Sequence, residues 1–380
     1  MTDLYFNNAF SKQPLAEAVN AMTPYLHHEY ENPLTESEGA EKAREILGTA
    51  RKNIGVLLQC ADDEIYFVSS GTEANNWAVK GAAFTHQKTK NHIILSQIEH
   101  FSVYQSVQFL QRQGFDATFV PVSPEGFVDV DFIAESIRPE TVLVTIQAAS
   151  DEIGVIQNLA AIASLKERFD DVLFHSDAIQ YLCYEDLSTG RIPLDLISIS
   201  SNAIYGPQGI AALYVRSGTR LTPLLHGGMQ EGGLRPGLQS IALTAGFGEA
   251  ARINALRKRE WKEKLTGLQE RIFRAMDSQS LSVTGSRSCR LVDNIHITSD
   301  VDGEALLTLL LTDGIRASSG STCYQYAQKE SHVLKALGRT QEEARGSLLF
   351  TLGKNHDAES VDILLGSIGR TVDHLRNVKP

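Results

Sequence analysis

The chain has 380 residues, of which 42% are hydrophobic and 21% are charged, which is ordinary for a globular protein large enough for two domains. A net charge of -11 argues against a general nucleic-acid binder. No apolar run is long enough to span a membrane, and the N-terminus lacks the pattern of a signal peptide. The four cysteines are widely spaced without a Cys-x-x-Cys pair, so we expect a cytoplasmic protein with no metal site.

Short apolar runs alternate with amphipathic segments from about residue 15 to residue 255. This pattern predicts strands at residues 65–68, 92–95, 141–146, 172–174, 196–199 and 210–215, and helices at residues 72–84, 102–113 and 159–169. Alternation of strands and helices predicts an α/β fold, in which helices cover both faces of a mainly parallel sheet.

A smaller unit is predicted after the α/β region. Residues 250–277 are charged and helical in period, and they lead into a strand near 291–297 and helices near 304–312 and 358–375. We therefore predict a large α/β domain over residues 14–255 and a small C-terminal α+β domain over residues 256–380.

A turn of small residues follows the first predicted strand and opens a helix at Gly71 and Thr72. Free backbone N–H groups and the positive end of the helix dipole suit a phosphate at such a place. The alternative is ordinary N-capping by Ser70 or Thr72. The segment by itself does not separate the two interpretations.

An acid, Asp177, follows the predicted strand 172–174. Side chains just past the carboxyl end of a parallel strand point into the usual ligand crevice, although a solvated loop acid is the alternative. His100 stands similarly after the strand 92–95, where a lone histidine is more often a capping or surface residue. These positions gain weight only together with neighbouring motifs.

Residues 197–209 read Ile-Ser-Ile-Ser-Ser-Asn-Ala-Ile-Tyr-Gly-Pro-Gln-Gly. They resemble the cofactor-lysine segment of the class V aminotransferase family, most closely the cysteine desulfurases, where the pattern is Ser-x-His-Lys-x-x-Gly-Pro-Lys-Gly. Asn202, Ala203 and Gln208 replace the histidine and the two lysines. The first of those lysines forms the Schiff base with pyridoxal phosphate. Alanine has no amine, so Ala203 can neither hold the cofactor covalently nor move a substrate proton.

The resemblance covers nearly the whole chain, with the motifs in the family's order. It implies fold type I of the pyridoxal-phosphate enzymes, a homodimer, and packing of residues 1–13 with the small domain. The family's cofactor-binding positions correspond here to Gly71, Thr72, His100, Asp177, Gln180 and Ser200.

Each of these positions has an implied role. Asp177 would keep the pyridine nitrogen protonated, so that the ring remains an electron sink. Gln180 would bond the ring hydroxyl, and His100 would stack on the ring and shuttle protons. Gly71, Thr72 and Ser200 would hold the phosphate.

Other positions depart from the family. Leu349 stands where the family has the arginine that grips the substrate carboxylate, and leucine cannot form that charged pair. Leu238 replaces the threonine that reaches the phosphate of the partner subunit, whereas a nearby substrate-binding arginine is kept as Arg235. Ala148 and Ser150 replace a histidine and an asparagine near the cofactor. The set predicts a natural, degenerate paralogue that lacks standard cysteine desulfurase or aminotransferase activity.

Residues 318–323 read Ser-Ser-Gly-Ser-Thr-Cys. They resemble the mobile loop of one cysteine desulfurase subgroup, whose thiol attacks the substrate sulfur and carries a persulfide. Small polar residues and glycine favour an exposed loop, so Cys323 has the setting of a reactive thiol.

Four hypotheses follow. The first is a desulfurase-like protein that holds pyridoxal phosphate non-covalently, or lacks it, and relays sulfur through Cys323 to an acceptor protein or an active paralogue. The second is an enzyme of altered chemistry, with a base such as His100, acting on a ligand that is not a simple α-amino acid. The third is an active desulfurase with a displaced lysine. The fourth is a purely structural partner of an active paralogue.

Overall fold

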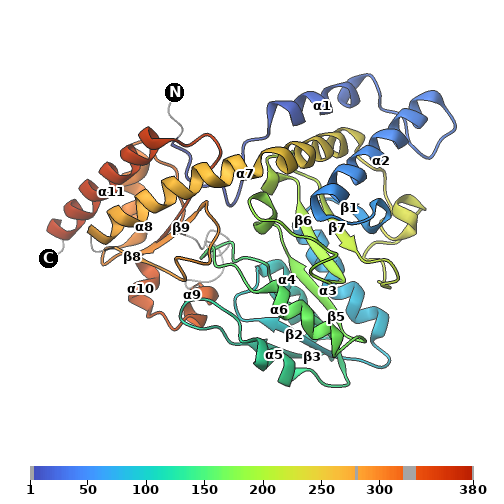
Figure 1. The fold of residues 1–380 in the computed structure, drawn as a ribbon, viewed down its shortest axis with the longest axis horizontal. Coiled ribbons are helices and arrows are strands. Elements are labelled where there is room, and N and C mark those ends of the chain that lie inside the picture. The colour runs from blue at the N-terminus through green and yellow to red at the C-terminus, as the bar shows by residue number, and fades with distance from the viewer. Residues whose placement is uncertain (1–3, 279–280, 320–330, 379–380) are drawn as a thin grey trace.

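The computed structural model describes residues 4–278, 281–319 and 331–378. Figure 1 shows a large sheet between helices and a small sheet beside the C-terminal helices, with the long helix α7 (Ile241–Ser278) running past both. Within the described ranges, no helix combines the length and the apolar character needed to cross a bilayer.

The large sheet has seven strands in the order β1-β7-β6-β5-β4-β2-β3. They are β1 (Ile65–Val68), β2 (His92–Ser96), β3 (Asp116–Val120), β4 (Thr141–Thr145), β5 (Leu173–Asp177), β6 (Leu196–Ser200) and β7 (Ala211–Val215). β7 is antiparallel to β1 and β6, and the other neighbouring strands are parallel. The predicted fold class is confirmed. The sequence pattern does not reveal β3, because that strand mixes polar and apolar residues.

Helices cover both faces of this sheet. They are α1 (Ala16–His27), α2 (Glu38–Leu58), α3 (Gly71–His86), α4 (Phe101–Gln111), α5 (Val130–Ser136) and α6 (Leu159–Ser164), together with the first half of α7. Successive strand residues point to opposite faces. Ile93 and Leu143 pack with α3 and α4, whereas Ile94 and Val144 pack in the core that includes α2, α6 and α7. The strands are therefore apolar throughout, as in other covered parallel sheets.

Two predicted elements differ in detail. The helix predicted for residues 159–169 stops at Ser164 and continues as one 3-10 turn, Leu165–Glu167. The long helix begins earlier than predicted, at Ile241. Its N-terminal part packs closely on α2, because a Cβ atom at Gly248 would lie 2.6 Å from the Cα of Ala50.

The small sheet has the strand order β10-β9-β8 and is antiparallel. Its strands are β8 (Ser282–Val283), β9 (Asn294–Thr298) and β10 (Ser347–Thr351), and its helices are α8 (Gly303–Thr312), α9 (His332–Ala336), α10 (Gln341–Arg345) and α11 (Ala358–Val378). The predicted boundary after residue 255 falls inside α7, so the division into domains stays a prediction.

The N-terminal segment returns to the small sheet. Tyr5 forms a parallel bridge with Arg316, and Asn7 forms one with Thr351. From there the chain passes to the large unit, where the N–H of Leu15 donates to the carbonyl of Tyr205. The segment thus spans the junction between the two sheets.

Candidate functional site

A cavity of about 310 Å³ opens at the carboxyl ends of the parallel strands, which is the usual ligand position in such sheets. Its described lining comprises Ala9, Phe10, Ser70, Gly71, Thr72, His100, Gln147, Ala149, Asp151, Asp177, Ile179, Gln180, Ser200, Asn202 and Ala203. All six predicted cofactor-binding residues are among them. The structure therefore brings together side chains from five separate strand ends.

One end of the cavity is formed by the start of α3. Ser70 caps this helix, since its hydroxyl accepts the backbone N–H of Glu73 at 3.1 Å. The first-turn N–H groups of Gly71 and Thr72 have no carbonyl of their own helix to bond. A Cβ atom at Gly71 would lie 2.2 Å from the Cδ1 of Ile179, so any larger residue here would require the Ile179 side chain to shift. Ser200, at the end of β6, also lines this cavity. The arrangement suits a phosphate.

Asp177, the last residue of β5, supplies a buried carboxylate. Its Oδ2 accepts a hydrogen bond from the side-chain amide of Asn75 at 2.6 Å, and its Oδ1 accepts one from the backbone N–H of Ile179 at 3.0 Å. Burial raises the pKa of Asp177, while His100 and these hydrogen bonds oppose the rise. A protonated ring nitrogen beside Asp177 would complete this charge balance.

His100 caps α4 with its own ring. Nδ1 accepts the backbone N–H of Ser102 at 3.1 Å and lies 2.7 Å from the Ser102 hydroxyl. That hydroxyl also accepts from the Asn75 amide at 2.8 Å, so its hydrogen is free to point at Nδ1. These bonds assign the neutral ring its proton at Nε2. In this tautomer Nε2 donates and does not accept, which favours a binding role for His100 over that of a base.

Ala203 lies in the short turn between β6 and β7 and is 4% exposed. Tyr205, two residues later, has the left-handed conformation with a φ of 64°. Its hydroxyl lies 2.8 Å from that of Tyr184 and accepts the backbone N–H of Lys354 at 2.8 Å, so the turn is fixed from both units. The cavity contains no lysine among its described lining residues.

The two other changed positions of this motif bind the N-terminal segment. The Oδ1 of Asn202 accepts the backbone N–H of Lys12 at 3.2 Å, and its Nδ2 donates to the carbonyl of Phe10 at 3.3 Å. Gln208 donates to the hydroxyl of Ser11 at 2.8 Å. Gln180 donates to the carbonyl of Ala9 at 2.8 Å, leaving its amide oxygen for a ligand. These amides hold residues 9–12, of which Ala9 and Phe10 line the cavity.

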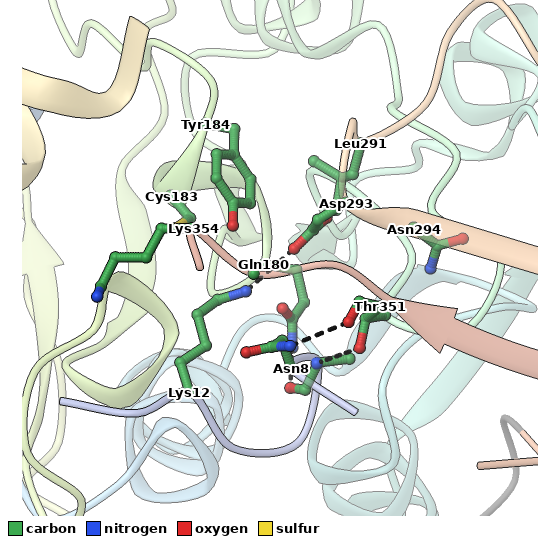
Figure 2. Close-up of polar contacts among 12 residues, drawn as sticks. Asn8, Lys12, Gln180, Cys183, Tyr184, Leu291, Asp293, Asn294, Thr351 and Lys354 are labelled. Carbon is green, nitrogen blue, oxygen red and sulfur yellow. Dashed lines mark hydrogen bonds and ion pairs between the residues drawn. The ribbon is translucent and has the colours of Figure 1, made fainter. Parts of the chain in front are cut away.

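A buried ion pair fixes the same segment (Figure 2). The Nζ of Lys12 lies 3.0 Å from Oδ2 of Asp293, with side-chain exposures of 1% and 5%. The rings of Tyr184 and Tyr205 lie 5.3 and 5.5 Å from this ammonium. Burial opposes the charge, but Asp293 outweighs it and holds the pKa of Lys12 above its usual range. Lys12 is thus committed to the junction and does not present an amine to the cavity.

Several of the positions singled out from the sequence lie outside the cavity lining, namely Ala148, Ser150, Gln208, Arg235, Leu238 and Leu349. Arg235 forms a two-point pair with Glu73, at 2.9 and 3.2 Å, which lowers the pKa of that carboxyl against the opposing effect of burial. Leu349 is fully buried in β10, opposite His296. Leu238 is 71% exposed.

Cys323 lies outside the described residues, but both flanks of its segment are described. On one side, the backbone of Ser318 pairs with that of Leu349. On the other, the hydroxyl of Ser331 donates to Glu152 at 2.7 Å, and Nε2 of His332 donates to the carbonyl of Glu99 at 2.9 Å. Glu99 directly precedes His100, so this flank is tied next to the cavity.

Sequence reasoning missed Asn75, Ser102, Lys12 and Asp151. Asn75 and Ser102 contribute by forming hydrogen bonds to Asp177 and His100, and no spacing in the sequence predicts such contacts. Lys12 has a partner 281 positions away. Asp151 had a usable signal, because it follows the strand end at residue 145 as Asp177 follows its own strand.

The aminotransferase class-V family profile matches residues 4–364. The chain is 35% identical over 381 residues to a cysteine desulfurase IscS of Dictyoglomus turgidum, covering 100% of this chain and 96% of that protein. It is 38% identical over 381 residues to cysteine desulfurase IscS 1 of Archaeoglobus fulgidus, covering 99% of this chain and 98% of that protein. A mitochondrial cysteine desulfurase of Arabidopsis thaliana is 38% identical and is covered over 80% of its length, against 95% of this chain.

Solved structures agree with these relatives. A NifS-like protein superimposes with a TM-score of 0.93 at 28% identity, covering 98% of this chain and 100% of that one. SspA in complex with cysteine superimposes with a TM-score of 0.82 at 30% identity, covering 93% and 100% of the two chains. The chain belongs to the class V aminotransferase family and is similar over its whole length to the cysteine desulfurases within it.

Proposed function

We propose that this protein is a desulfurase-like member of its family that holds a pyridoxal-phosphate cofactor without a covalent bond to a lysine. The observation that carries the proposal is that Ala203 lines the same cavity as four predicted cofactor-binding residues, Asp177, Gln180, His100 and Ser200. The hydrogen bonds that hold Asp177 and His100 at this cavity support the proposal.

The residues present fit the chemistry of this cofactor. The start of α3 offers N–H groups to a phosphate, Asp177 offers a carboxylate to a ring nitrogen, and Gln180 has an amide oxygen free for a ring hydroxyl. When bound, the cofactor supplies an electron-withdrawing ring. Asp177 would hold the proton on the ring nitrogen, and His100 would donate from Nε2. Phe10 and Ala9 would keep water from that side of the cavity.

We propose a sulfur-relay role for Cys323. In this step the Cys323 thiolate attacks the outer sulfur of a donor protein's persulfide, and the donor thiolate leaves with its electron pair. No oxidant is needed, because one S–S bond forms as another breaks. The described flank that follows it is held beside His100, because Ser331 donates to Glu152 and His332 donates to the carbonyl of Glu99.

The cofactor proposal is tested by absorption spectroscopy with added pyridoxal phosphate, then borohydride reduction and peptide mass spectrometry. We expect a saturable visible band and no lysine adduct. The matched control is Ala203→Lys, which should give an adduct at residue 203. A specific lysine adduct in the unmodified chain would overturn the proposal, and so would the lack of any band.

The sulfur proposal has its own test. Labelled persulfide is offered by a donor protein, and transfer is read by mass spectrometry. Cys323→Ser should abolish transfer, whereas Cys289→Ser should leave it unchanged, since Cys289 is the exposed thiol of the described residues. Undiminished transfer in Cys323→Ser would exclude the relay.

The principal rival is an active cysteine desulfurase that uses a different lysine. The observation in its favour is that the relatives at 35% and 38% identity are cysteine desulfurases. Sulfide release from free cysteine with added cofactor would establish it. The ion pair of Lys12 with Asp293 argues that Lys12 is not that residue.

We also propose a homodimer. Leu225, Met229 and Leu238 are exposed at 46%, 73% and 71%, so residues 225–238 present three large apolar side chains to solvent. Glu231 fixes this loop by pairing with Arg51 at 2.6 Å. Light scattering should give a dimer mass, and a Met229→Asp/Leu238→Asp double variant should give a monomer. A monomeric unmodified chain would refute the dimer.

A further inference from the structure

The charge of the cavity is unusual for a site of phosphate binding. Its described lining holds two carboxylates, Asp151 and Asp177, and neither lysine nor arginine. Leu349, which stands at the family's carboxylate-binding arginine, is buried in β10 and adds no positive charge. The cavity is therefore electrostatically suited to a cationic group in addition to an anionic one.

The two carboxylates differ in how they are held. Asp177 has hydrogen bonds from Asn75 and Ile179, as described above. The carboxylate of Asp151 is half-buried, and within the described part of the chain no hydrogen bond or ion pair reaches it. A carboxylate that is partly removed from water and lacks a partner is unfavourable unless a ligand supplies one.

The carboxylates also act on each other. Burial raises the pKa of Asp177, and the charge of Asp151 raises it further. A ligand with one cationic group for each acid would relieve this repulsion. A protonated ring nitrogen would pair with the carboxylate of Asp177. The carboxylate of Asp151 would then still lack a cationic partner.

We propose that the cavity binds the amine form of the cofactor, pyridoxamine phosphate, in preference to the aldehyde form, with Asp151 pairing its ammonium group. The proposal rests on the proposed function, since it concerns the same cavity. The two forms share the phosphate, the ring and the ring hydroxyl, and they differ at one substituent. An aldehyde gains its tight binding in this family from condensation with a lysine, and Ala203 removes that gain. An ammonium gains a charge-assisted hydrogen bond from Asp151, which Ala203 leaves unaffected.

His100 is compatible with this assignment. Because Nδ1 accepts the backbone N–H of Ser102, the neutral ring carries its proton on Nε2 and can donate it to a ligand oxygen. Gln147 and Gln180, which also line the cavity, are neutral. The negative side chains therefore dominate the field of the described lining.

The test compares three ligands on the purified full-length chain by isothermal titration calorimetry: pyridoxamine phosphate, pyridoxal phosphate and pyridoxine phosphate. The last carries a hydroxyl at the same substituent, so it cannot react with surface lysines. We expect pyridoxamine phosphate to bind about tenfold more tightly than pyridoxine phosphate, as for one charge-assisted hydrogen bond. Asp151→Asn should reduce this ratio to about one.

Two further variants separate charge from folding. Asp151→Glu keeps the carboxylate and should keep most of the preference. Asp170→Asn removes an exposed acid that does not line the cavity, and should change nothing. A preference that survives Asp151→Asn would overturn the role of Asp151. Equal affinities in the unmodified chain would overturn this inference and leave the proposed function standing. Failure of all three ligands to bind would overturn both.

Discussion

Two parts of the cavity differ in how closely their residues match the family's pattern. They are the cofactor-binding side, at Asp177 and His100, and the covalent side, at Asn202 and Ala203. On the first side, Asp177 and His100 are joined through Asn75 and Ser102 into one hydrogen-bonded chain. On the second side, Ala203 presents no functional group, and its neighbour Asn202 is bonded to the N-terminal segment. Asp177 ends β5, whereas Ala203 follows β6, so the residue at position 203 can change without altering the hydrogen bonds of Asp177.

The turn that carries Ala203 nevertheless has a fixed backbone. Tyr205 has a left-handed conformation, which costs a non-glycine residue roughly 1–2 kcal/mol. Its hydroxyl is held by Tyr184 and by the backbone of Lys354. The turn thus serves to join the two units, independently of the residue that it presents.

The largest expected effect comes from the ion pair of Lys12, which holds the N-terminal segment of residues 9–12. Lys12→Met would leave Asp293 buried and unpaired, which we expect to lower the free energy of unfolding by about 3–5 kcal/mol. Urea denaturation measures this change. The double variant Lys12→Met/Asp293→Leu should recover most of the loss. Lys42→Met, which breaks an exposed pair with Glu38, should lose under about 0.5 kcal/mol. If Lys12→Met lowers the free energy of unfolding only slightly, the segment of residues 9–12 is held mainly by other contacts.

The second effect concerns pH and the flank beside the cavity. Burial raises the pKa of Glu152 to about 8, although the Ser331 hydroxyl opposes the rise. The folded state therefore binds a proton more tightly than the unfolded state does. The contribution of Glu152 to the free energy of unfolding is fully present below about pH 4.5. It is lost as the pH rises toward 8, and the total loss is up to ~4 kcal/mol.

Glu152→Gln tests this pH dependence. The variant should flatten the fall in unfolding free energy between pH 5 and pH 8, measured by urea denaturation across that range. Glu342→Gln, which changes an exposed carboxylate, is the control and should keep the slope of the unmodified chain. An unchanged slope in Glu152→Gln would show that Glu152 is not protonated in the folded state at neutral pH.

A third, intermediate effect tests the cofactor-binding side. Asp177→Asn removes the carboxylate that would pair with a protonated ring nitrogen, and we expect pyridoxine phosphate to bind about 10- to 100-fold more weakly. Calorimetric titration measures the change, with Asp170→Asn as the matched control. Unaltered affinity would mean that the cofactor-binding side is not used as the family uses it.

The smallest effect comes from Asn202. Asn202→Ala removes two hydrogen bonds to the N-terminal segment, at 3.2 and 3.3 Å, for a loss of about 1 kcal/mol. Hydrogen exchange should show faster exchange of the amides at residues 10–12 and little change elsewhere. If the amides at residues 10–12 exchange at the same rate in the variant and in the unmodified chain, the ion pair of Lys12 is sufficient to hold the segment.

Much of the fold was predictable because its signals are local. The strands β2, β4 and β6 are short apolar runs, and the turn before α3 carries its own capping serine. β3 was less predictable, because Asp116 and Thr118 interrupt its apolar pattern. The end of α6 was also less predictable. The residues of the 3-10 turn that follows it have the same apolar spacing as an α-helix, so the sequence pattern does not mark where α6 ends.

The candidate site was predictable where a motif marks a strand end, as at Asp177 and Ser200. It was less so where a residue acts through a partner distant in sequence. Asn75 lies 102 positions from Asp177, and Lys12 lies 281 positions from Asp293. Neither pairing leaves a periodic or spaced signal, because both depend on how strands and helices are ordered in space.

The sequence by itself determined the family, the α/β class and the presence of an alanine at position 203, since these depend on residue types and their order along the chain. The tertiary structure alone decided the tautomer of His100, the commitment of Lys12 to Asp293, and the unpaired carboxylate of Asp151 in the cavity. The physical reason is that protonation, pairing and burial depend on which groups lie within a few ångströms of one another, and only the folded chain sets those distances.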